Sequence, residues 1–268
     1  MKQFNTTGCY DHPRYWDLAF DDETTGEADF IEAAARKYCP FPLRRILEPG
    51  CGGGRLLAEM ALRGYEVIGC DVSAAAVEYC RTRLPETQPS CRVEVADMLE
   101  FRSPEPVDVA CCFVNTFRHL LTETDAVRHL NSVADSLRAG GLYLIGMHLL
   151  PPDADEEDEE EWTAEADGVR IDMRLQVTSC SRLTRLETLR FEMQINDNGA
   201  RHVVTSEYPM RIYRADQFQS LLSKVPRFRL LDVYDFWYDI EDPLQLSDEL
   251  GDTVVVLQKL DAAAESTL

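Results

Sequence analysis

The chain has 268 residues, 45% of them hydrophobic, which is enough to bury a substantial core in one domain with an insertion or in two small domains. Its formal net charge is −21 and no dense Lys/Arg run is present, so nucleic acid is disfavoured as a partner. No apolar run is long enough to cross a bilayer, and residues 1–5 form no apolar signal core. No membrane partner is expected.

Cysteine and histidine usage indicates a reducing compartment and no metal site. The nine cysteines are odd in number and contain no C-x-x-C pair, and Cys70, Cys111 and Cys112 fall in predicted buried strands. We therefore expect reduced thiols in a cytoplasmic protein. His and Cys do not cluster with zinc spacing, so no metal ligand is assigned.

Aromatic residues gather near the start of the chain, where Tyr10, Tyr15 and Trp16 are close together. Apolar spacing then predicts a helix over Ala28–Tyr38. Segment 45–56, RILEPGCGGGRL, follows and predicts a short strand, a glycine-rich turn and the start of a helix. Such a turn exposes bare backbone and a helix N-terminus to a ligand, as in sites for NAD or S-adenosylmethionine.

The details of this turn favour S-adenosylmethionine over NAD. The dinucleotide pattern G-x-G-x-x-G is met by Gly50 and Gly52, but Arg55 occupies the third glycine position. Glu48 precedes the turn, where a carboxylate would repel a pyrophosphate. S-adenosylmethionine carries an ammonium and a sulfonium and has no phosphate, so it suits this turn.

Three more predicted strands each end in a polar residue. The strand over Tyr65–Cys70 precedes Asp71, the strand over Cys91–Ala96 precedes Asp97-Met98, and the strand over Val107–Val114 precedes Asn115. Open α/β sheets bind ligands at the carboxyl ends of their strands, and an acidic residue about 20 positions past the turn is placed to accept ribose hydroxyls. The alternative for Asp71 is a helix N-cap. Helices are predicted between the strands, over Leu56–Arg63, Ala74–Leu84 and Asp125–Leu137, the last with Gly140-Gly141 as its stop signal.

The chain resembles the class I S-adenosylmethionine-dependent methyltransferases over roughly residues 10 to 150. The matching segments are 48–54 (EPGCGGG), Asp71 after VIGC, 96–98 (ADM) and 137–144 (LRAGGLYL). The resemblance implies a Rossmann-like, doubly wound, seven-stranded α/β sheet with S-adenosyl-L-methionine as cofactor. It also implies that Gly50 and Gly52 lie against the methionine portion, Asp71 binds the ribose, and Asp97 and Met98 flank the adenine. The full expected cofactor-binding set is Tyr15, Glu48, Gly50, Cys51, Gly52, Asp71, Val72, Asp97, Met98 and Asn115. Tyr15 is expected to close over the cofactor, or else to pack in the core beside Trp16.

After Pro151-Pro152 the pattern changes. Residues 153–161 are almost wholly acidic and predict a solvated loop, and three strands with alternating apolar residues follow, over 169–177, 189–195 and 202–212. This predicts an antiparallel β insertion after the fifth strand. We interpret it as a lid over the acceptor site; a homodimerisation sheet is the alternative, and the two are compatible. The expected division is 1–150 core, 151–212 insertion and 213–268 return to the core. The return contains a helix over Ala215–Leu222, strands over Phe228–Phe236 and Thr253–Leu257, and a frayed tail.

The sequence therefore predicts methyl transfer to an amine or hydroxyl of a small molecule. The later segments look most like bacterial small-molecule N- and O-methyltransferases, including those acting on amino sugars. His119, just past the fourth strand, is the candidate general base; the alternative is a histidine that packs or caps the next helix. Arg118 is expected to pair with an acidic substrate group or with surface acids. Rival functions are a non-catalytic binding or scaffold protein and a methyltransferase of macromolecules. A candidate aromatic lining of the acceptor site comprises Trp162, Tyr208, Tyr213, Trp237 and Tyr238.

Overall fold

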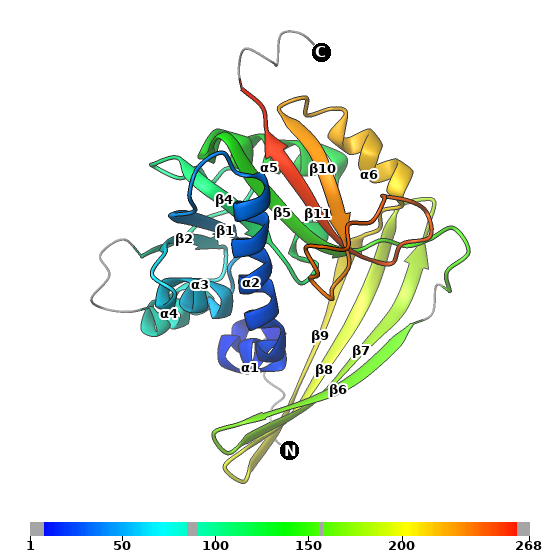
Figure 1. Cartoon of the computed structure of the whole chain (residues 1–268). Helices are drawn as coiled ribbons and strands as arrows, with labels where there is room; N and C mark the ends of the chain where they lie inside the picture. The colour runs from blue at the N-terminus through cyan, green and yellow to red at the C-terminus, as the bar shows by residue number, and fades with distance from the viewer. Residues whose placement is uncertain (1–7, 85–90, 156–157, 262–268) are drawn as a thin grey trace.

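The core of the protein is a seven-stranded sheet in the order β10-β11-β5-β4-β1-β2-β3 (Figure 1). This computed structural model describes residues 8–84, 91–155 and 158–261. The strands are β1 (Arg45–Pro49), β2 (Glu66–Asp71), β3 (Arg92–Val95), β4 (Val107–Cys112), β5 (Leu137–His148), β10 (Phe228–Tyr234) and β11 (Asp252–Lys259). The strands from β5 to β3 are parallel, and β11 runs antiparallel to both β5 and β10. The predicted Rossmann-like α/β fold is confirmed.

Helices cover both faces of this sheet. One apolar cluster joins α2 (Asp21–Tyr38), α3 (Arg55–Leu62) and α4 (Ala74–Arg83) to one face, and another joins α5 (Glu123–Ser136) and α6 (Ala215–Leu222) to the other. Local capping sets where two of these helices begin. The Ser73 hydroxyl accepts from the amide of Ala76 at the start of α4, and the Thr122 hydroxyl accepts from the amide of Asp125 at the start of α5.

The predicted stop signal after α5 is wrong in position. The helix ends at Ser136 and β5 begins at once, so that Gly140 and Gly141 lie inside the strand. The pairing with β4 jumps from Val107↔Leu137 to Val109↔Leu142, which makes the glycine segment a bulge. Gly140 has φ +78, a conformation that favours glycine. The two glycines therefore mark an irregularity within a strand.

The insertion is a four-stranded antiparallel sheet, β6 (Glu159–Ala166), β7 (Val169–Ser181), β8 (Leu186–Asp197) and β9 (Ala200–Arg211). The prediction of a loop over 153–161 missed the start of β6; residues 156–157 lie outside the described residues. On β6, Glu159 faces outward and pairs with Arg174 of β7 at 2.7 Å, while Trp162 packs inward. Acidic residues on an exposed face are compatible with a strand once the opposite face is buried.

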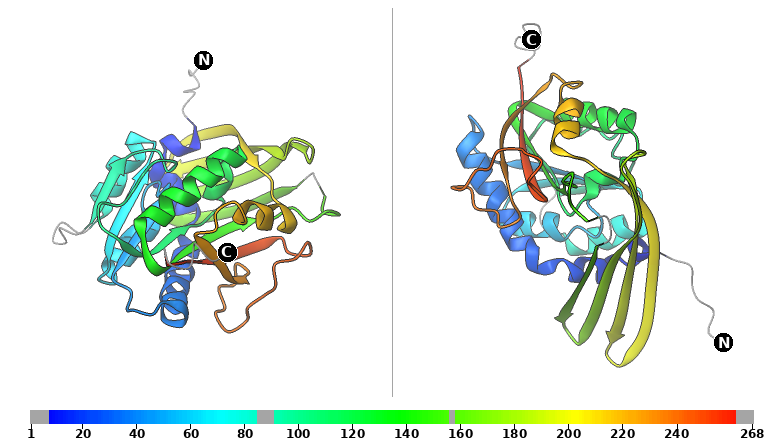
Figure 2. Two further views of the ribbon diagram at one scale, coloured as in Figure 1. Left: turned by 90° about the horizontal axis from the view of Figure 1, so that it is seen from above. Right: turned by 90° about the vertical axis from the view of Figure 1, so that its right-hand side faces the viewer.

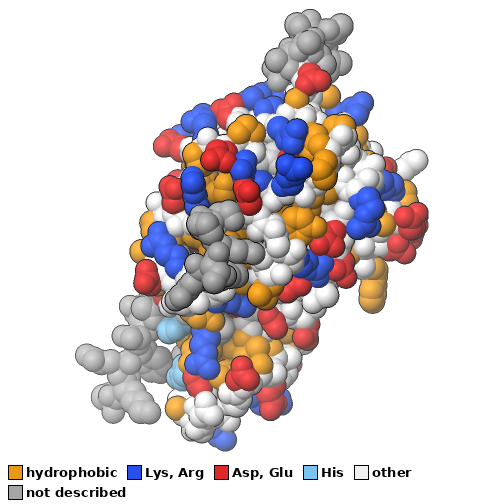
Figure 3. All heavy atoms as spheres, turned by 60° about the vertical axis from the view of Figure 1, so that its left-hand side comes forward, with side chains coloured by type: hydrophobic (Ala, Val, Ile, Leu, Met, Phe, Trp, Pro, Cys, Tyr) orange, Lys and Arg blue, Asp and Glu red, His pale blue; other side chains and the backbone are white. Residues whose placement is uncertain are grey.

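The apolar face of the insertion packs on the N-terminal segment of the same chain. This segment comprises the 3-10 helix η1 (Cys9–Asp11) and α1 (Pro13–Ala19), and it lies between the insertion and the core (Figure 2). The buried members of this cluster are Cys9, Ala19, Val169, Ile171, Met173, Phe191, Met193, Ile195 and Val204. The outward residues of the sheet are mostly charged and polar, although Val203 of β9 is exposed as well, and Figure 3 shows acidic and basic side chains interspersed on one face of the molecule. A homodimer through the insertion stays a prediction, as does the division into domains.

Candidate functional site

A cavity of about 290 Å³ lies at the carboxyl ends of the parallel strands. Its walls come from the N-terminal segment, the glycine turn after β1, and the ends of β2, β3 and β4. The lining residues are Tyr10, Pro13, Trp16, Gly50, Gly52, Gly53, Asp71, Val72, Ser73, Ala76, Ala96, Asp97, Met98, Val114, Thr116 and His119. The structure thus brings together seven of the residues expected from the sequence: Gly50, Gly52, Asp71, Val72, Asp97, Met98 and His119.

The glycine turn is held close to its neighbours by its backbone. The amides of Gly50 and Cys51 both donate to the carbonyl of Cys70 at the end of β2, at 2.7 and 3.0 Å. Gly50 has φ +71, and a Cβ there would lie 2.6 Å from Thr116 Cγ2. A Cβ on Gly53 would lie 2.5 Å from Asp17 Oδ2. Glycine is therefore needed here both for the turn and for the close approach of neighbouring groups.

Asp71 is oriented by two backbone amides. Its Oδ2 accepts from Gly52 N at 3.0 Å and its Oδ1 accepts from Ser73 N at 2.8 Å. A carboxylate offers about four acceptor positions, so two remain for ligand hydroxyls. The alternative for Asp71 was the N-cap of the next helix, but the residue in that position is Ser73, whose hydroxyl caps α4. Asp71 therefore lies at the cavity with acceptor capacity left over, which fits a ribose diol.

The segment after β3 is fixed from below by a buried histidine. His129 Nδ1 lies 2.9 Å from the carbonyl oxygen of Met98, and its Nε2 lies 2.6 Å from the hydroxyl of Tyr143. Burial lowers the pKa of His129 to about 4, so the ring is neutral at neutral pH. Asp97 Oδ1 accepts from the amide of Leu99 at 2.9 Å, which shapes the turn that carries Met98. These contacts hold Asp97 and Met98 at one end of the cavity.

His119 lies in the cavity between two tyrosines. Its Nε2 is 2.9 Å from the hydroxyl of Tyr10, and the ring of Tyr208, from β9, lies 5.6 Å away between centroids. Burial, and secondarily the charge of Arg118, lower the pKa of His119 to about 4. The imidazole is therefore neutral at neutral pH and can accept a proton or a hydrogen bond.

Four of the expected cofactor residues are not among those that line the cavity, and the first is Tyr15. Its hydroxyl donates to Asp197 Oδ2 at 3.1 Å, and its ring packs near His202 of β9. Its neighbours Tyr10, Pro13 and Trp16 line the cavity instead. The N-terminal segment does close over the cavity, although not through Tyr15. Sequence reasoning noted Tyr10 and Trp16 but could not tell which aromatic faced inward.

Glu48 and Asn115 lie beside the cavity and make internal contacts. Glu48 lies near Arg55 and Glu27, its Oε2 has no hydrogen-bond partner among the described residues, and burial raises its pKa well above the usual range. Alternation along β1 explains this, because Glu48 shares a face with Ile46, which packs on α2 and α3. Asn115 Oδ1 accepts from His148 N at 2.8 Å and so ties the end of β4 to β5.

Cys51 is also placed differently from the expectation. Its side chain is 6% exposed and belongs to the apolar cluster under α3. A Cβ on Gly69 of β2 would lie 2.8 Å from its sulfur, so the thiol fills the space between the turn and the sheet. Cys51 therefore supports the turn from below.

The candidate aromatic lining is mostly structural. Trp162 donates its indole N–H to the carbonyl of Ala19 at 2.9 Å, and Tyr213 is buried in the cluster with α5 and α6. Trp237 is 88% exposed, and Tyr238 packs against Phe30 and Phe113. Tyr208 packs against two residues of the cavity, Tyr10 and His119.

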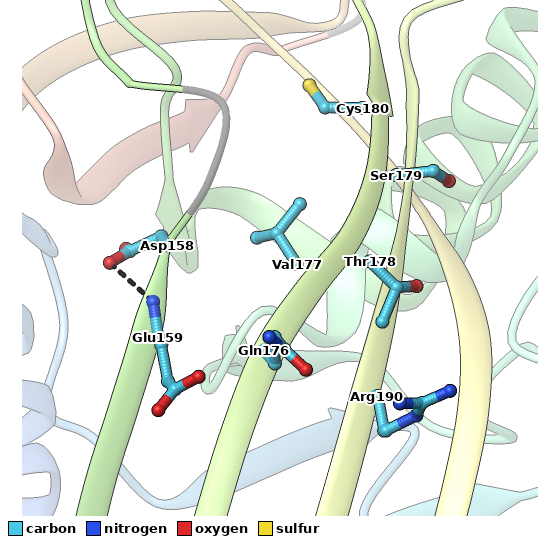
Figure 4. Close-up of a pocket in the computed structure, with 8 residues that line it drawn as sticks. All are labelled: Asp158, Glu159, Gln176, Val177, Thr178, Ser179, Cys180 and Arg190. Carbon is cyan, nitrogen blue, oxygen red and sulfur yellow. Dashed lines mark hydrogen bonds between the residues drawn. The ribbon is translucent and has the colours of Figure 1, made fainter.

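A second hollow, of about 700 Å³, lies on the insertion (Figure 4). It is open and lined mostly by polar side chains of β6, β7 and β8 and of the residue before β6. The amide of Glu159 donates to Asp158 Oδ1 at 2.9 Å, and a dashed line marks this bond in Figure 4. Arg190 at its edge is already paired with Glu207 of β9. We assign no function to this hollow.

Within residues 8–84, 91–155 and 158–261, no group of three or more His, Cys, Asp and Glu side chains is arranged to hold a metal ion. Over the same part of the chain, no helix is both long and apolar enough to span a membrane.

Comparisons with known proteins agree with this geometry. Residues 46–141 match the family model of a methyltransferase domain. A ubiquinone biosynthesis O-methyltransferase of Azoarcus sp. (strain BH72) is 32% identical over 106 residues, covering 37% of this chain and 44% of that protein. A dTDP-4-amino-2,3,4,6-tetradeoxy-D-glucose N,N-dimethyltransferase of Saccharopolyspora spinosa is 29% identical over 100 residues, covering 37% and 41%. The chain spans about half the length of the curated relatives that it matches.

Two solved structures resemble nearly the whole chain. The sugar N-methyltransferase KedS8 from Streptoalloteichus sp. has a TM-score of 0.72 at 17% identity and covers 97% of each chain. An S-adenosylmethionine-dependent methyltransferase from Clostridium acetobutylicum has a TM-score of 0.70 at 13% identity, covering 89% of this chain and 92% of that one. At these identities the likeness concerns the fold. Residues 46–141 are therefore a methyltransferase domain, and the chain that carries them has the fold of the class I S-adenosylmethionine-dependent methyltransferases.

Proposed function

We propose that this protein is an enzyme that transfers the methyl group of S-adenosylmethionine to an amine of a small molecule. The observation that carries the proposal is the position of neutral His119 in the same cavity as the glycine turn and Asp71. A ligand held by the turn and by Asp71 would share this cavity with a group able to accept a hydrogen bond from the nucleophile.

The residues present fit this cofactor better than a dinucleotide. Two carboxylates, Asp71 and Asp97, line the cavity and would repel a pyrophosphate. Arg55, at the third glycine position, donates to Thr24 Oγ1 at 2.9 Å and to Glu27 Oε1 at 2.8 Å. Its guanidinium therefore binds α2 and does not serve as a phosphate ligand. The free acceptor positions of Asp71 suit a ribose diol. A ligand with a ribose and without phosphates matches these features.

The chemistry asked of the protein is modest. S-adenosylmethionine supplies a methyl group already activated on a sulfonium, so alignment of the nucleophile and exclusion of water are the main tasks. Tyr10, Pro13 and Trp16 close the cavity on the side of the N-terminal segment. His119 would accept a hydrogen bond from the N–H of a neutral amine and so aim the nitrogen lone pair at the methyl group. The methylated product forms as an ammonium, which releases its proton to solvent.

The properties of His119 favour an amine over a hydroxyl. A pKa of about 4 makes this imidazole a weak base, unsuited to ionising an alcohol. A neutral amine already has a free lone pair, and a desolvated site shifts amines toward that neutral form. Two of the similar proteins are named as N-methyltransferases of sugars or amino sugars, which supports an amine on a small polar molecule. The net charge of −21 disfavours a nucleic-acid acceptor.

The test is product formation from matched acceptors. Purified protein and S-adenosylmethionine are incubated with amino sugars and simple amines, and separately with the corresponding alcohols, and products are detected by mass spectrometry. We expect methylated amines and S-adenosylhomocysteine in equal amounts. The His119→Gln variant, which misplaces the acceptor of this hydrogen bond, should lose about 10²-fold in kcat while binding S-adenosylhomocysteine normally. Methylation of the alcohols in preference would overturn the choice of amine, and cofactor binding without any product would favour the scaffold function.

A further inference from the structure

Arg118 is a buried arginine that joins three elements beside the cavity. It lies in the 3-10 helix η2 (Thr116–His119) and is 5% exposed. Its Nε donates to the carbonyl of Arg211, at the end of β9, at 3.0 Å. Its Nη1 donates to Asn115 Oδ1 at 3.2 Å, and its Nη2 pairs with Glu187 near the start of β8. The expected partners, a substrate acid or surface acids, are replaced by a buried carboxylate of the insertion.

The loop that Arg118 holds has an unusual backbone. Val114 and Asn115, which follow β4 after Phe113, have φ values of +49 and +61. For a β-branched residue such as Val114 this conformation is strained, and it persists only where the surroundings fix it. Asn115 is fixed by His148 N on one side and by Arg118 on the other. The same loop places Val114 and His119 in the wall of the cavity.

The ion pair itself is poorly explained by stability. The side chains of Arg118 and Glu187 are 7% and 9% exposed. Buried pairs of this kind contribute little net free energy of folding compared with apolar residues of similar volume, because both charges lose their hydration. What the planar guanidinium provides is geometry, since its fork reaches Arg211 and Asn115 as well as the carboxylate.

We propose that Arg118 is a positioning residue for methyl transfer. Its side chain connects the loop after β4 to strands β8 and β9, and this connection fixes the position of His119 in the cavity. This rests on the role proposed above for His119. The insertion then has two roles. It covers the N-terminal segment, and through its contacts with Arg118 it holds η2, and with it His119, in place.

The connection also has an electrostatic consequence. The groups that face His119 are Tyr10 from η1, Tyr208 from β9 and Arg118 from η2, with Glu187 of β8 behind Arg118. Burial raises the pKa of both tyrosines, so they are uncharged. The positive charge of Arg118 contributes, after burial, to the lowered pKa of His119. Removal of this charge should therefore raise the pKa of the imidazole.

The experiment compares three variants at this pair with one control. Arg118→Met removes both charge and fork, Arg118→Lys keeps the charge and loses the fork, and Glu187→Gln keeps a polar partner without its charge. The control is Arg190→Met, which breaks an exposed pair with Glu207 on the outer face of the same sheet. Each protein is measured for kcat and KM, for binding of S-adenosylhomocysteine, and for the titration of His119 by NMR.

The expected results separate positioning from general stability. Arg118→Met should lower kcat by about 10²-fold, the scale of a misplaced group, with cofactor binding unchanged and the pKa of His119 raised. Arg118→Lys should lower kcat while leaving the titration near that of the original protein. Glu187→Gln should give a smaller loss of kcat, and Arg190→Met should change nothing.

The proposal is overturned if Arg118→Lys and Glu187→Gln keep full kcat, and these two milder variants decide the matter even if Arg118→Met does not fold. It is also overturned if folded Arg118→Met leaves kcat and the His119 titration unchanged. If the unaltered protein methylates no acceptor, the proposed function fails. The NMR signals of His119 and of the amides of Val114 and Asn115 still test the positioning, since they do not depend on turnover.

Discussion

Replacing Asp71 by Asn should weaken the cofactor without unfolding the protein. In the structure the two carboxylate oxygens accept from Gly52 N at 3.0 Å and from Ser73 N at 2.8 Å. Asn has a single acceptor oxygen, so one of these amides would face an NH₂ group. Both the orientation of the side chain and its capacity to accept ligand hydroxyls are therefore reduced, although its size is preserved.

The expected loss follows from the hydrogen bonds involved. Bonds to a charged group contribute about 1.5–3 kcal/mol each, and leaving a buried partner unpaired costs about 1–3 kcal/mol. We expect the ribose hydroxyls to lose about one such bond in total, because the Asn oxygen can still accept once. A loss of about 1.5–3 kcal/mol corresponds to a Kd roughly 10- to 150-fold higher.

Isothermal titration with S-adenosylhomocysteine measures this difference, and a thermal melt of the ligand-free protein reports its stability. The matched control is Asp172→Asn, which removes a carboxylate paired with Arg170 on the exposed face of the insertion. The control should bind the ligand normally. A Kd for Asp71→Asn equal to that of the unaltered protein would refute the reasoning, because Asp71 would then have no contact with the ligand.

Two further predictions concern the cluster around the N-terminal segment and the buried histidines. Phe191→Ala should lower the free energy of unfolding by about 3–5 kcal/mol and weaken the binding of S-adenosylhomocysteine, because the Phe191 ring packs 5.2 Å from that of Trp16 in the cavity wall. Leu183→Ala, at an exposed position, is the control, and normal ligand affinity in Phe191→Ala would contradict the coupling. Burial lowers the pKa of His119 and His129 from 6.5 to about 4, so the folded state resists protonation and the stability they contribute above pH 6.5 is lost as pH falls through that value toward 4. The pKa of Asp17, raised by burial to about 6, acts with the opposite sign in the same window, so the measurement is the difference between the urea titrations of the unaltered protein and of His119→Gln. The unaltered protein should lose up to roughly 3 kcal/mol more than this variant between pH 6.5 and 4, and identical pH profiles would contradict the value for His119.

The alternation of strands and helices was predictable because it depends on the local spacing of apolar residues. Each strand of the core that was expected from apolar runs is present within a few residues, and the polar residues at the ends of β2 and β3 meet in one cavity. The orientation of Glu48 was also within reach, since period-two alternation places it on the face of Ile46. The helix end was also predicted to within one residue, but the place of Gly140-Gly141 inside β5 was not, because these glycines form a bulge that depends on pairing with β4.

The N-terminal wall of the cavity could not be read from the sequence. Tyr10, Tyr15 and Trp16 are all aromatic and lie within one short segment. Which of them faces the cavity depends on partners almost 200 residues away, such as Asp197 for Tyr15 and Ser206 for Cys9. Local patterns carry no information about such contacts. The acidic start of β6 was missed for the same reason, because the inward face of this strand is buried by the N-terminal segment, which is distant in the sequence.

The long sequence separation within this wall has a consequence for biosynthesis. Residues 8–20 are translated early, yet the hydrogen bonds of Cys9 with Ser206 and of Arg14 with Asp197 can form only after those partners have been synthesised. Contacts of such separation form late, because the entropy of closing a long loop must first be overcome. The glycine turn and the parallel strands can fold on the ribosome well before the cavity is closed. Cofactor binding would therefore report that synthesis has passed β9, and a nascent chain halted before residue 197 should contain the five parallel strands of the core without a finished site.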